Sequence, residues 1–366
     1  MEEFRETMII FRADGNADIG AGHIMRCLSI ADAALEMGKH SVFITASPHF
    51  EDIINQHGHK NEILDTKYTD MPLELNRVSG LLRHYAPAAL IVDSYYVTKD
   101  YLNSLQQLCR EIGNKLIYID DVMTFAYPCD ILINYNIYAP EREQNYRSLY
   151  SIAKRNLPLF LLGPKYMPLR SEFQILPKRK LKENVQNVLV STGGSDPEHM
   201  NLEIIERLKE HKKCGEMSGL CFHFVIGTLN EDKKKIEEAS KGVSGIVLHY
   251  NISNMGELMQ SCDLAISAAG STLYELCATQ TPTNTYVTAD NQIPGAESFE
   301  YHGVLNNCGD VRISSPKELA ESLLEETMKL AKDYSRRARF AGRMGEIVDR
   351  DGAKRIVEFI QEIILF

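Results

Sequence analysis

Short apolar segments alternate with helix-like apolar periodicity along the chain, and this pattern occurs twice. In the first half, apolar runs predict strands over residues 8–12, 41–46, 89–93, 115–120 and 131–134, with helices over 22–37 and 99–111. In the second half, strands are predicted over 187–191, 222–227, 245–249, 263–267 and 283–287, with helices over 198–209, 231–239, 255–261 and 271–278. The alternation favours two parallel sheets, because consecutive parallel strands are joined by crossover helices.

The chain is therefore expected to form two α/β domains. The predicted N-terminal domain comprises residues 1–163 and the predicted C-terminal domain residues 186–350, with a linker over 164–185 that contains prolines and a short basic stretch. The periodicity of residues 351–366 predicts a terminal helix that packs back on the first domain. Ligands of such sheets bind beyond the carboxyl ends of the strands, so we expect a site in a cleft between the domains.

Composition narrows the class of protein. The 366 residues are 44% hydrophobic and 25% charged, as in soluble globular proteins. The net charge of −10, without basic blocks interleaved with aromatic residues, argues against a nucleic-acid partner. Because no apolar run is long enough to cross a bilayer and residues 1–6 lack a signal-peptide core, we expect no membrane insertion. The eight cysteines form no Cys-x-x-Cys pair, which favours reduced thiols in a cytoplasmic protein over disulfides or zinc.

A glycine-rich turn over residues 14–23 joins the first predicted strand to the first predicted helix. Gly20 and Gly22 let the backbone approach a ligand, and the helix start offers N–H groups to an anion. His23 could accept a proton there at neutral pH, or it could be an ordinary residue of the first helical turn. Met25 stands where a dinucleotide fingerprint has its third glycine, and no acidic residue follows the second strand, so NAD binding is poorly supported.

Two turns in the second half have the same strand-to-helix setting. Residues 191–197 contain Gly193 and Gly194 and could cradle a phosphate or form an ordinary turn, with Asp196 either binding substrate or capping the next helix. In residues 267–275, small residues precede a helix that carries Glu275 in its first turns. That carboxylate could bind ribose hydroxyls or merely stabilise the helix start.

Several other polar residues could have either a functional or a purely structural role. Asp93, Asp120 and Asp121 lie at the ends of predicted strands, where carboxylates could perform acid–base work or form turns. Residues 290–292, Asp-Asn-Gln, could bind a sugar or cap a helix. His57 and His59 lack the spacing of a helical metal pair and are predicted to lie at the surface.

Taken together, these segments resemble a known family. Residues 12–14 and 20–28, together with 163–170, 191–196, 267–275 and 289–292, resemble in the same order the UDP-sugar hydrolases of pseudaminic acid biosynthesis, often called PseG, and their SpsG-type relatives in spore-coat polysaccharide synthesis. That family is similar to GT-B glycosyltransferases, especially the MurG-type enzyme that makes lipid II. The resemblance implies an α/β GT-B fold of two Rossmann-like domains, with UDP held chiefly by the C-terminal one.

The resemblance also implies a reaction and its residues. The family hydrolyses UDP-2,4-diacetamido-2,4,6-trideoxy-β-L-altrose without a metal: water attacks the anomeric carbon with inversion, and UDP leaves. The family's catalytic histidine, the general base, falls on His23. Glu275 matches the ribose-binding glutamate of the related transferases, and Ile252 lies in the matching uracil loop. The full set expected to bind substrate or UDP is Arg12, Asp14, Gly20, Gly22, Gly193, Gly194, Ile252, Gly270, Ser271, Thr272, Glu275, Asn291 and Gln292.

No metal and no cofactor is expected, and the expected partner is a small UDP-sugar; the sequence is compatible with a monomer. Three alternatives remain: a GT-B glycosyltransferase that passes the sugar to an acceptor, a hydrolysing epimerase, and a nucleotide-sugar-binding protein without enzymatic activity. The transferase is disfavoured because the first half has no evident apolar patch with basic residues. The sugar itself could be a different UDP- or CMP-linked one, because pockets discriminate weakly against small apolar changes.

Overall fold

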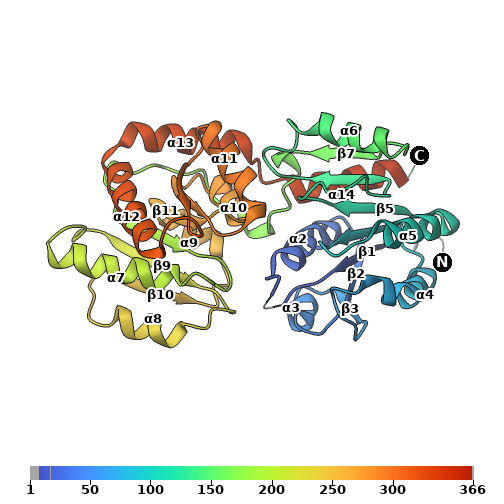
Figure 1. Ribbon diagram of the computed structural model, residues 1–366, viewed down its shortest axis with the longest axis horizontal. Helices are drawn as coiled ribbons and strands as arrows, with labels where there is room; N and C mark the ends of the chain where they lie inside the picture. The colour runs from blue at the N-terminus through green and yellow to red at the C-terminus, as the bar shows by residue number, and fades with distance from the viewer. Residues whose placement is uncertain (1–7, 17, 365–366) are drawn as a thin grey trace. The chain divides into compact units, whose positions relative to one another are not determined.

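The computed structural model describes residues 8–16 and 18–364, which separate into two compact units (Figure 1). The first unit contains the described residues up to Ser171 together with those from Arg350 onward, and the second contains Glu172–Asp349. The N-terminal stretch 1–6 and the last two residues of the predicted terminal helix lie outside the described residues.

The first unit is built on a parallel seven-stranded sheet with the order β3-β2-β1-β4-β5-β6-β7. This order reverses direction between β1 and β4, and ligand sites of open α/β sheets form at such a switch point. The strands are β1 (Met8–Ala13), β2 (His40–Thr45), β3 (Lys60–Ile63), β4 (Ala89–Asp93), β5 (Lys115–Ile119), β6 (Ile131–Asn134) and β7 (Leu159–Leu162).

Helices cover this sheet. They are α2 (Gly22–Glu36), α3 (Glu51–Gln56), α4 (Leu75–Tyr85), α5 (Lys99–Ile112), α6 (Glu143–Ile152) and α14 (Gly352–Ile364), with short 3-10 turns η1 (Met71–Glu74), η2 (Pro164–Tyr166) and η3 (Ser171–Phe173). On one face, Val78 of α4 and Leu105 of α5 share a buried cluster with Ile10 of β1. Phe11 and Phe43, which point to the other face, are also fully buried and stack 5.0 Å apart. The terminal helix α14 packs against α2.

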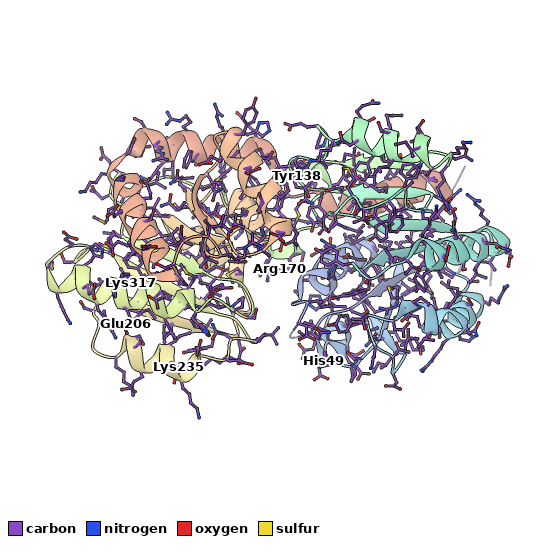
Figure 2. The ribbon with its side chains drawn as sticks, viewed as in Figure 1. His49, Tyr138, Arg170, Glu206, Lys235 and Lys317 are labelled. Carbon is purple, nitrogen blue, oxygen red and sulfur yellow. The ribbon has the colours of Figure 1, made fainter. Side chains whose placement is uncertain are left out.

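The second unit has its own parallel sheet of six strands, in the order β10-β9-β8-β11-β12-β13. Its strands are β8 (Asn187–Ser191), β9 (Cys221–Ile226), β10 (Ile246–Tyr250), β11 (Leu264–Ala268), β12 (Thr283–Val287) and β13 (Asn306–Asp310). Its helices are α7 (Met200–Lys213), α8 (Lys233–Ser240), α9 (Met255–Ser261), α10 (Thr272–Ala278), α11 (Ile293–Tyr301), α12 (Pro316–Lys332) and α13 (Tyr334–Ile347), with the 3-10 turn η4 (Asp290–Gln292). Charged side chains such as Glu206 on α7 and Lys235 on α8 lie on the outside (Figure 2).

Every predicted strand and helix has a counterpart, and β4, β6, β8, β12 and α9 begin and end at the predicted residues. The pattern missed β3, β7 and β13 and did not assign α3, α4, α6, α12 or α13. β13 is the clearest case, because its sequence Asn-Asn-Cys-Gly-Asp is poor in strand-forming residues. It is held at the sheet edge by pairing with β12, in a register that shifts between Thr285 and Val287.

Candidate active site

The glycine-rich turn leads directly from β1 into α2. Asn16 and Gly20 exchange backbone hydrogen bonds of 2.9 and 3.3 Å, and the Asn16 side-chain oxygen accepts from the backbone N–H groups of Asp18 and Ile19. Gly20 has a φ of +71°, a conformation that glycine adopts without steric cost. The turn thus fixes where α2 begins and places His23 in its first turn, beyond the carboxyl end of β1.

His23 is paired with a carboxylate on the neighbouring strand. Asp93 is the last residue of β4, which pairs with β1, and its Oδ1 lies 2.7 Å from His23 Nδ1. Asp93 is 1% exposed and His23 is 5% exposed, so this contact is screened little by solvent. The ring of Tyr95 meets the His23 ring edge-on, with centroids 4.5 Å apart. The imidazole is therefore held in one orientation from two sides.

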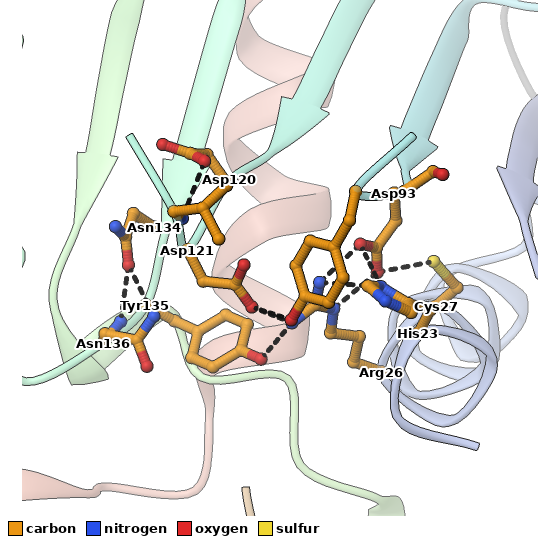
Figure 3. A network of polar contacts seen from close by, with 12 residues as sticks. His23, Arg26, Cys27, Asp93, Asp120, Asp121, Asn134, Tyr135 and Asn136 are labelled. Carbon is orange, nitrogen blue, oxygen red and sulfur yellow. Dashed lines mark hydrogen bonds and ion pairs between the residues drawn. The ribbon is translucent and has the colours of Figure 1, made fainter. Parts of the chain in front are cut away.

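Arg26, one helical turn after His23, binds the same carboxylate (Figure 3). Its Nε donates to Asp93 Oδ2 at 2.5 Å, and a terminal nitrogen donates to Oδ1. The other terminal nitrogen donates to Tyr135 Oη at 2.6 Å and to Asp121 Oδ2 at 3.1 Å. A planar guanidinium suits this two-pronged grip, which a lysine could not make.

The charges of this cluster set its protonation. Burial alone would raise the pKa of Asp93, but the Arg26 charge, together with His23, outweighs burial and holds that pKa well below its usual range. Burial raises the pKa of Tyr135 to about 12, and burial with the nearby Asp121 charge raises that of Tyr95 further. Asp93 is thus an anion and both phenols are neutral near neutral pH.

An anionic Asp93 assigns the proton on the imidazole. His23 Nδ1 lies 2.7 Å from Asp93 and 3.0 Å from an Arg26 nitrogen, and one nitrogen cannot both donate to the first and accept from the second. The shorter contact to a carboxylate favours a proton on Nδ1, which leaves Nε2 as an acceptor. Within residues 8–16 and 18–364, no hydrogen-bond partner is recorded for Nε2. The arrangement can accept a proton at Nε2 while Asp93 stabilises the resulting cation.

Arg12 and Asp14, predicted to contact substrate, form an internal network instead. The Arg12 side chain is 0% exposed and donates to both carboxylate oxygens of Glu74 at 2.6 and 2.7 Å and to Asp14 at 2.6 Å. Asp14 in turn accepts from the backbone N–H of Ala46 at 2.7 Å. Burial lowers the pKa of Arg12, but the bonds to Glu74 and the Asp14 charge more than compensate and raise it. Arg12 therefore fastens β1 to neighbouring segments rather than presenting its charge to a ligand.

In the second unit, the loop after β8 exposes Gly193 and Gly194 at the carboxyl edge of the sheet. A Cβ atom on Gly193 or Gly194 would meet no atom within 4 Å, whereas one on Gly227 would lie 2.1 Å from the Gly194 carbonyl oxygen. One side of the loop therefore packs closely against Gly227, and the other side, at Gly193 and Gly194, is open. Asp196 accepts from the backbone N–H groups of Met200 and Asn201 at 2.9 and 3.0 Å, which assigns it to the helix start.

The second predicted turn of this unit follows β11. Gly270, Ser271 and Thr272 form the start of α10, and Ser271 makes no side-chain capping bond. A Cβ atom on Gly270 would meet nothing within 4 Å. Glu275 lies half-buried in the first turn of α10, and Ile252 lies half-buried in the segment after β10. All these residues are beyond the carboxyl ends of their strands, the edge where ligands of parallel sheets bind.

The polar group after β12 divides into two roles. Gln292 uses its side-chain oxygen to accept from the backbone N–H of Thr288 at 2.9 Å and from the Thr288 hydroxyl at 3.1 Å, so it closes this turn. Asn291 is exposed.

One surface prediction for the first unit is wrong. His59 was predicted to lie at the surface, but it is only 4% exposed. The carboxylate of Asp32 on α2 lies 2.8 Å from both His59 Nε2 and His57 Nδ1.

Arg26, Tyr95 and Tyr135 were not predicted as site residues. Arg26 could have been found, because a residue three positions after His23 lies on the same face of a helix. Tyr95 follows the strand-ending Asp93 by two positions, a weaker signal. Tyr135 directly follows β6 and lies 109 positions from Arg26 in the sequence, and only the sheet order brings the two together.

The fold of this chain resembles that of known glycosyltransferases. Residues 178–351 match the model of the glycosyltransferase family 28 C-terminal domain. The calicheamicin glycosyltransferase CalG4 superposes with a TM-score of 0.62 at 15% identity over 99% of this chain and 98% of that one. A UDP-glucosyltransferase from Polygonum tinctorium gives 0.67 at 12% identity over 98% and 99%. The chain has the predicted GT-B fold.

Proteins similar in sequence indicate a narrower group than the structural similarities do. MJ1062 of Methanocaldococcus jannaschii is 28% identical over 72% of this chain, and the match spans 52% of that protein's length. UDP-2,4-diacetamido-2,4,6-trideoxy-beta-L-altropyranose hydrolase of Campylobacter jejuni is 24% identical over 73% of this chain and 86% of its own. Spore coat polysaccharide biosynthesis protein SpsG of Bacillus subtilis is 21% identical over 96% and 97%. The predicted resemblance to the PseG and SpsG proteins, relatives of GT-B glycosyltransferases, is confirmed.

The described part of the chain has neither a membrane-spanning helix nor a metal-binding cluster. None of its helices combines the length and apolar character needed to span a bilayer. None of its groups of three or more His, Cys, Asp or Glu side chains is arranged to hold a metal ion.

Proposed function

We propose that this chain is an enzyme acting on nucleotide-sugars, and specifically that it hydrolyses a UDP-sugar to UDP and the inverted free sugar. The substrate we propose is UDP-2,4-diacetamido-2,4,6-trideoxy-β-L-altrose, the compound in the name of the Campylobacter jejuni relative. The single observation that carries the hydrolytic reading is the His23–Asp93 pair, because its geometry supplies a proton acceptor for water.

In the proposed reaction, a water molecule donates one proton to His23 Nε2 as its oxygen attacks the anomeric carbon. The bond from that carbon to the diphosphate oxygen breaks, and its electron pair leaves with UDP, so the configuration at the carbon inverts. Asp93 stabilises the imidazolium that forms, because its carboxylate stays ionised beside Arg26. Base catalysis of this kind contributes about 10²- to 10⁴-fold in rate.

Negative charge develops on the diphosphate as UDP leaves, so the groups that bind UDP must stabilise that charge. For this role we propose the second unit's open loops, with Gly193, Gly194, Gly270, Ser271 and Thr272 facing the diphosphate. We further propose Glu275 for the ribose hydroxyls, the backbone of Ile252 for the uracil, and Asn291 for the sugar. In the first unit we propose Gly20 and Gly22 as substrate-binding residues, because the turn before α2 lets the backbone approach a ligand. Gln292 would act by shaping the turn, since its side-chain oxygen is already engaged with Thr288.

The glycosyltransferase remains the second candidate, because the family 28 model that matches residues 178–351 describes a glycosyltransferase domain. One assay separates the two: the protein is incubated with UDP-sugars, with and without acceptors, and the products are followed by NMR. Acceptor-independent release of an inverted sugar supports the hydrolase. Release only with an acceptor supports the transferase, a sugar epimerised at C2 supports an epimerase, and binding of UDP without any turnover would leave a binding protein.

A further inference from the structure

The first unit has a cavity at the edge of its sheet opposite to His23. It has a volume of about 430 Å³ and lies at the amino ends of β5, β6 and β7, where Lys115, Ile131 and Leu159 begin their strands. His23 and Asp93 lie beyond the carboxyl ends of β1 and β4 instead. In a parallel sheet these two edges are separated by the length of the strands, about 15 Å. A ligand of this cavity is therefore not the group that reacts at His23.

The cavity is lined by more positive than negative charge. Arg110 from the end of α5, Lys115 from the start of β5 and Arg155 from the segment before β7 contribute three cations, and Asp130 contributes one carboxylate. Asp130 is partly committed, since its Oδ2 accepts from the backbone N–H of Leu116 at 2.8 Å. The cavity thus carries a net positive charge in a protein whose formal net charge is −10.

The three cations keep donors available for a ligand. Arg155 donates from one terminal nitrogen to Asn103 at 2.7 Å, which fixes its guanidinium and leaves the remaining N–H groups for another acceptor. Lys115 is half-buried, and among the described residues no side-chain partner is recorded for it or for the exposed Arg110. An anchored guanidinium and a nearby ammonium match the oxygens of carboxylates and phosphates.

We propose that this cavity binds a small anion with at least two negative charges, carried by carboxylate or phosphate groups. Its volume falls in the range of about 300–1,000 Å³ that is typical of small-molecule sites. Gln106 and Asn156 supply neutral donors and acceptors, and Ile363, near the end of α14, supplies an apolar wall. Figure 1 shows α5, β5, β7 and α14 gathered in this part of the first unit. The proposal is independent of the reaction proposed at His23.

The test is calorimetric titration of the full chain with citrate and with inorganic pyrophosphate at constant ionic strength, which keeps general screening equal. Amide hydrogen exchange then separates binding in this cavity from binding at a nucleotide site. We expect one citrate or one pyrophosphate per chain, with a Kd raised at least tenfold by Lys115→Met and by Arg110→Gln. Lys99→Met is the matched control, because Lys99 is exposed at the other end of α5 and its substitution removes the same charge.

Amide hydrogen exchange locates the bound anion. We expect protection of residues 106–116 and 153–159 on adding citrate, and no such protection in Lys115→Met. Arg110 is exposed, so its variant keeps the test valid if Lys115→Met fails to fold. The proposal is overturned if neither anion binds, if Lys99→Met weakens binding as much as the two cavity variants, or if protection appears only around residues 14–23.

Discussion

The imidazole of His23 and the carboxylate of Asp93 meet at 2.7 Å although 70 positions separate them in the sequence. Two independent pieces of backbone produce this contact. β1 and β4 are parallel neighbours at the switch point of the sheet, so the strand end that carries Asp93 lies beside the turn that starts α2. Arg26 then locks the carboxylate from the same helix that carries His23. The pair is thus a consequence of topology, and its chemistry can be tested by substitution.

Replacing His23 by asparagine should remove the proton acceptor without disturbing the second unit. We expect His23→Asn to lower kcat for UDP-sugar hydrolysis by about 10²- to 10⁴-fold, which is the usual contribution of a general base. The Kd for UDP, measured by calorimetry, should change less than about threefold. His84→Asn is the control, since His84 is exposed at the end of α4, and it should retain its turnover. Wild-type turnover in His23→Asn would refute the assigned role.

Arg26 should contribute strongly to the stability of the first unit. Arg26→Met removes the cation that compensates the buried Asp93, and an uncompensated buried charge costs about 3–5 kcal/mol. The comparison is Arg83→Met, which breaks an exposed pair with Glu111 that is worth about 0–1 kcal/mol. Urea unfolding followed by far-UV circular dichroism measures both, because the chain contains no tryptophan to report by fluorescence. Equal losses in the two variants would contradict this role of Arg26.

The lowered pKa of Asp93 predicts acid sensitivity. In the unfolded chain an aspartate titrates near pKa 3.9, and in the folded protein the pKa of Asp93 is lower, so the folded state binds fewer protons in that range. Its stabilising contribution is complete above about pH 5 and is lost as the pH falls through 4 toward the folded-state pKa. We therefore expect the free energy of unfolding to fall more steeply with acid in the wild type than in Asp93→Asn. Parallel pH curves for the two proteins would exclude Asp93 as a source of the acid sensitivity.

The sequence was sufficient for the parts of the fold that local patterns encode. Strands such as β4 and β8 have a central apolar run, Ala-Leu-Ile-Val in β4 and Val-Leu-Val in β8, with polar residues at one or both ends, so their limits follow from the residues themselves. Edge strands are different: β3 reads Lys-Asn-Glu-Ile and is only partly buried, so pairing with β2, not local propensity, makes it a strand.

The candidate site shows the same division. His23 was recognisable from its glycine-rich turn, but its partners Asp93 and Tyr95 come from the end of β4 and the segment after it, and no local pattern indicates which strand ends will be neighbours. Arg12 illustrates the reverse error. The family resemblance implied that Arg12 contacts substrate, but Glu74, 62 positions later, binds its guanidinium inside the unit.

The loop after β8 offers a matched pair of glycine substitutions. Gly227→Ala places a Cβ atom 2.1 Å from the Gly194 carbonyl oxygen, so the loop must move, and we expect a loss of about 1–3 kcal/mol in unfolding free energy. Gly194→Ala meets nothing within 4 Å, so its effect on stability should be below about 1 kcal/mol.

The two variants should nevertheless both weaken UDP binding if this loop faces the diphosphate as proposed. In Gly194→Ala the new methyl group projects from the open side of the loop and occupies space that the phosphates would need, so the Kd for UDP should rise at least tenfold while the protein stays folded. Gly219→Ala, before β9, also meets no atom within 4 Å and should leave the Kd unchanged. Calorimetric titration with UDP measures all three. A wild-type Kd in Gly194→Ala would remove this loop from the nucleotide site, whatever the result at His23.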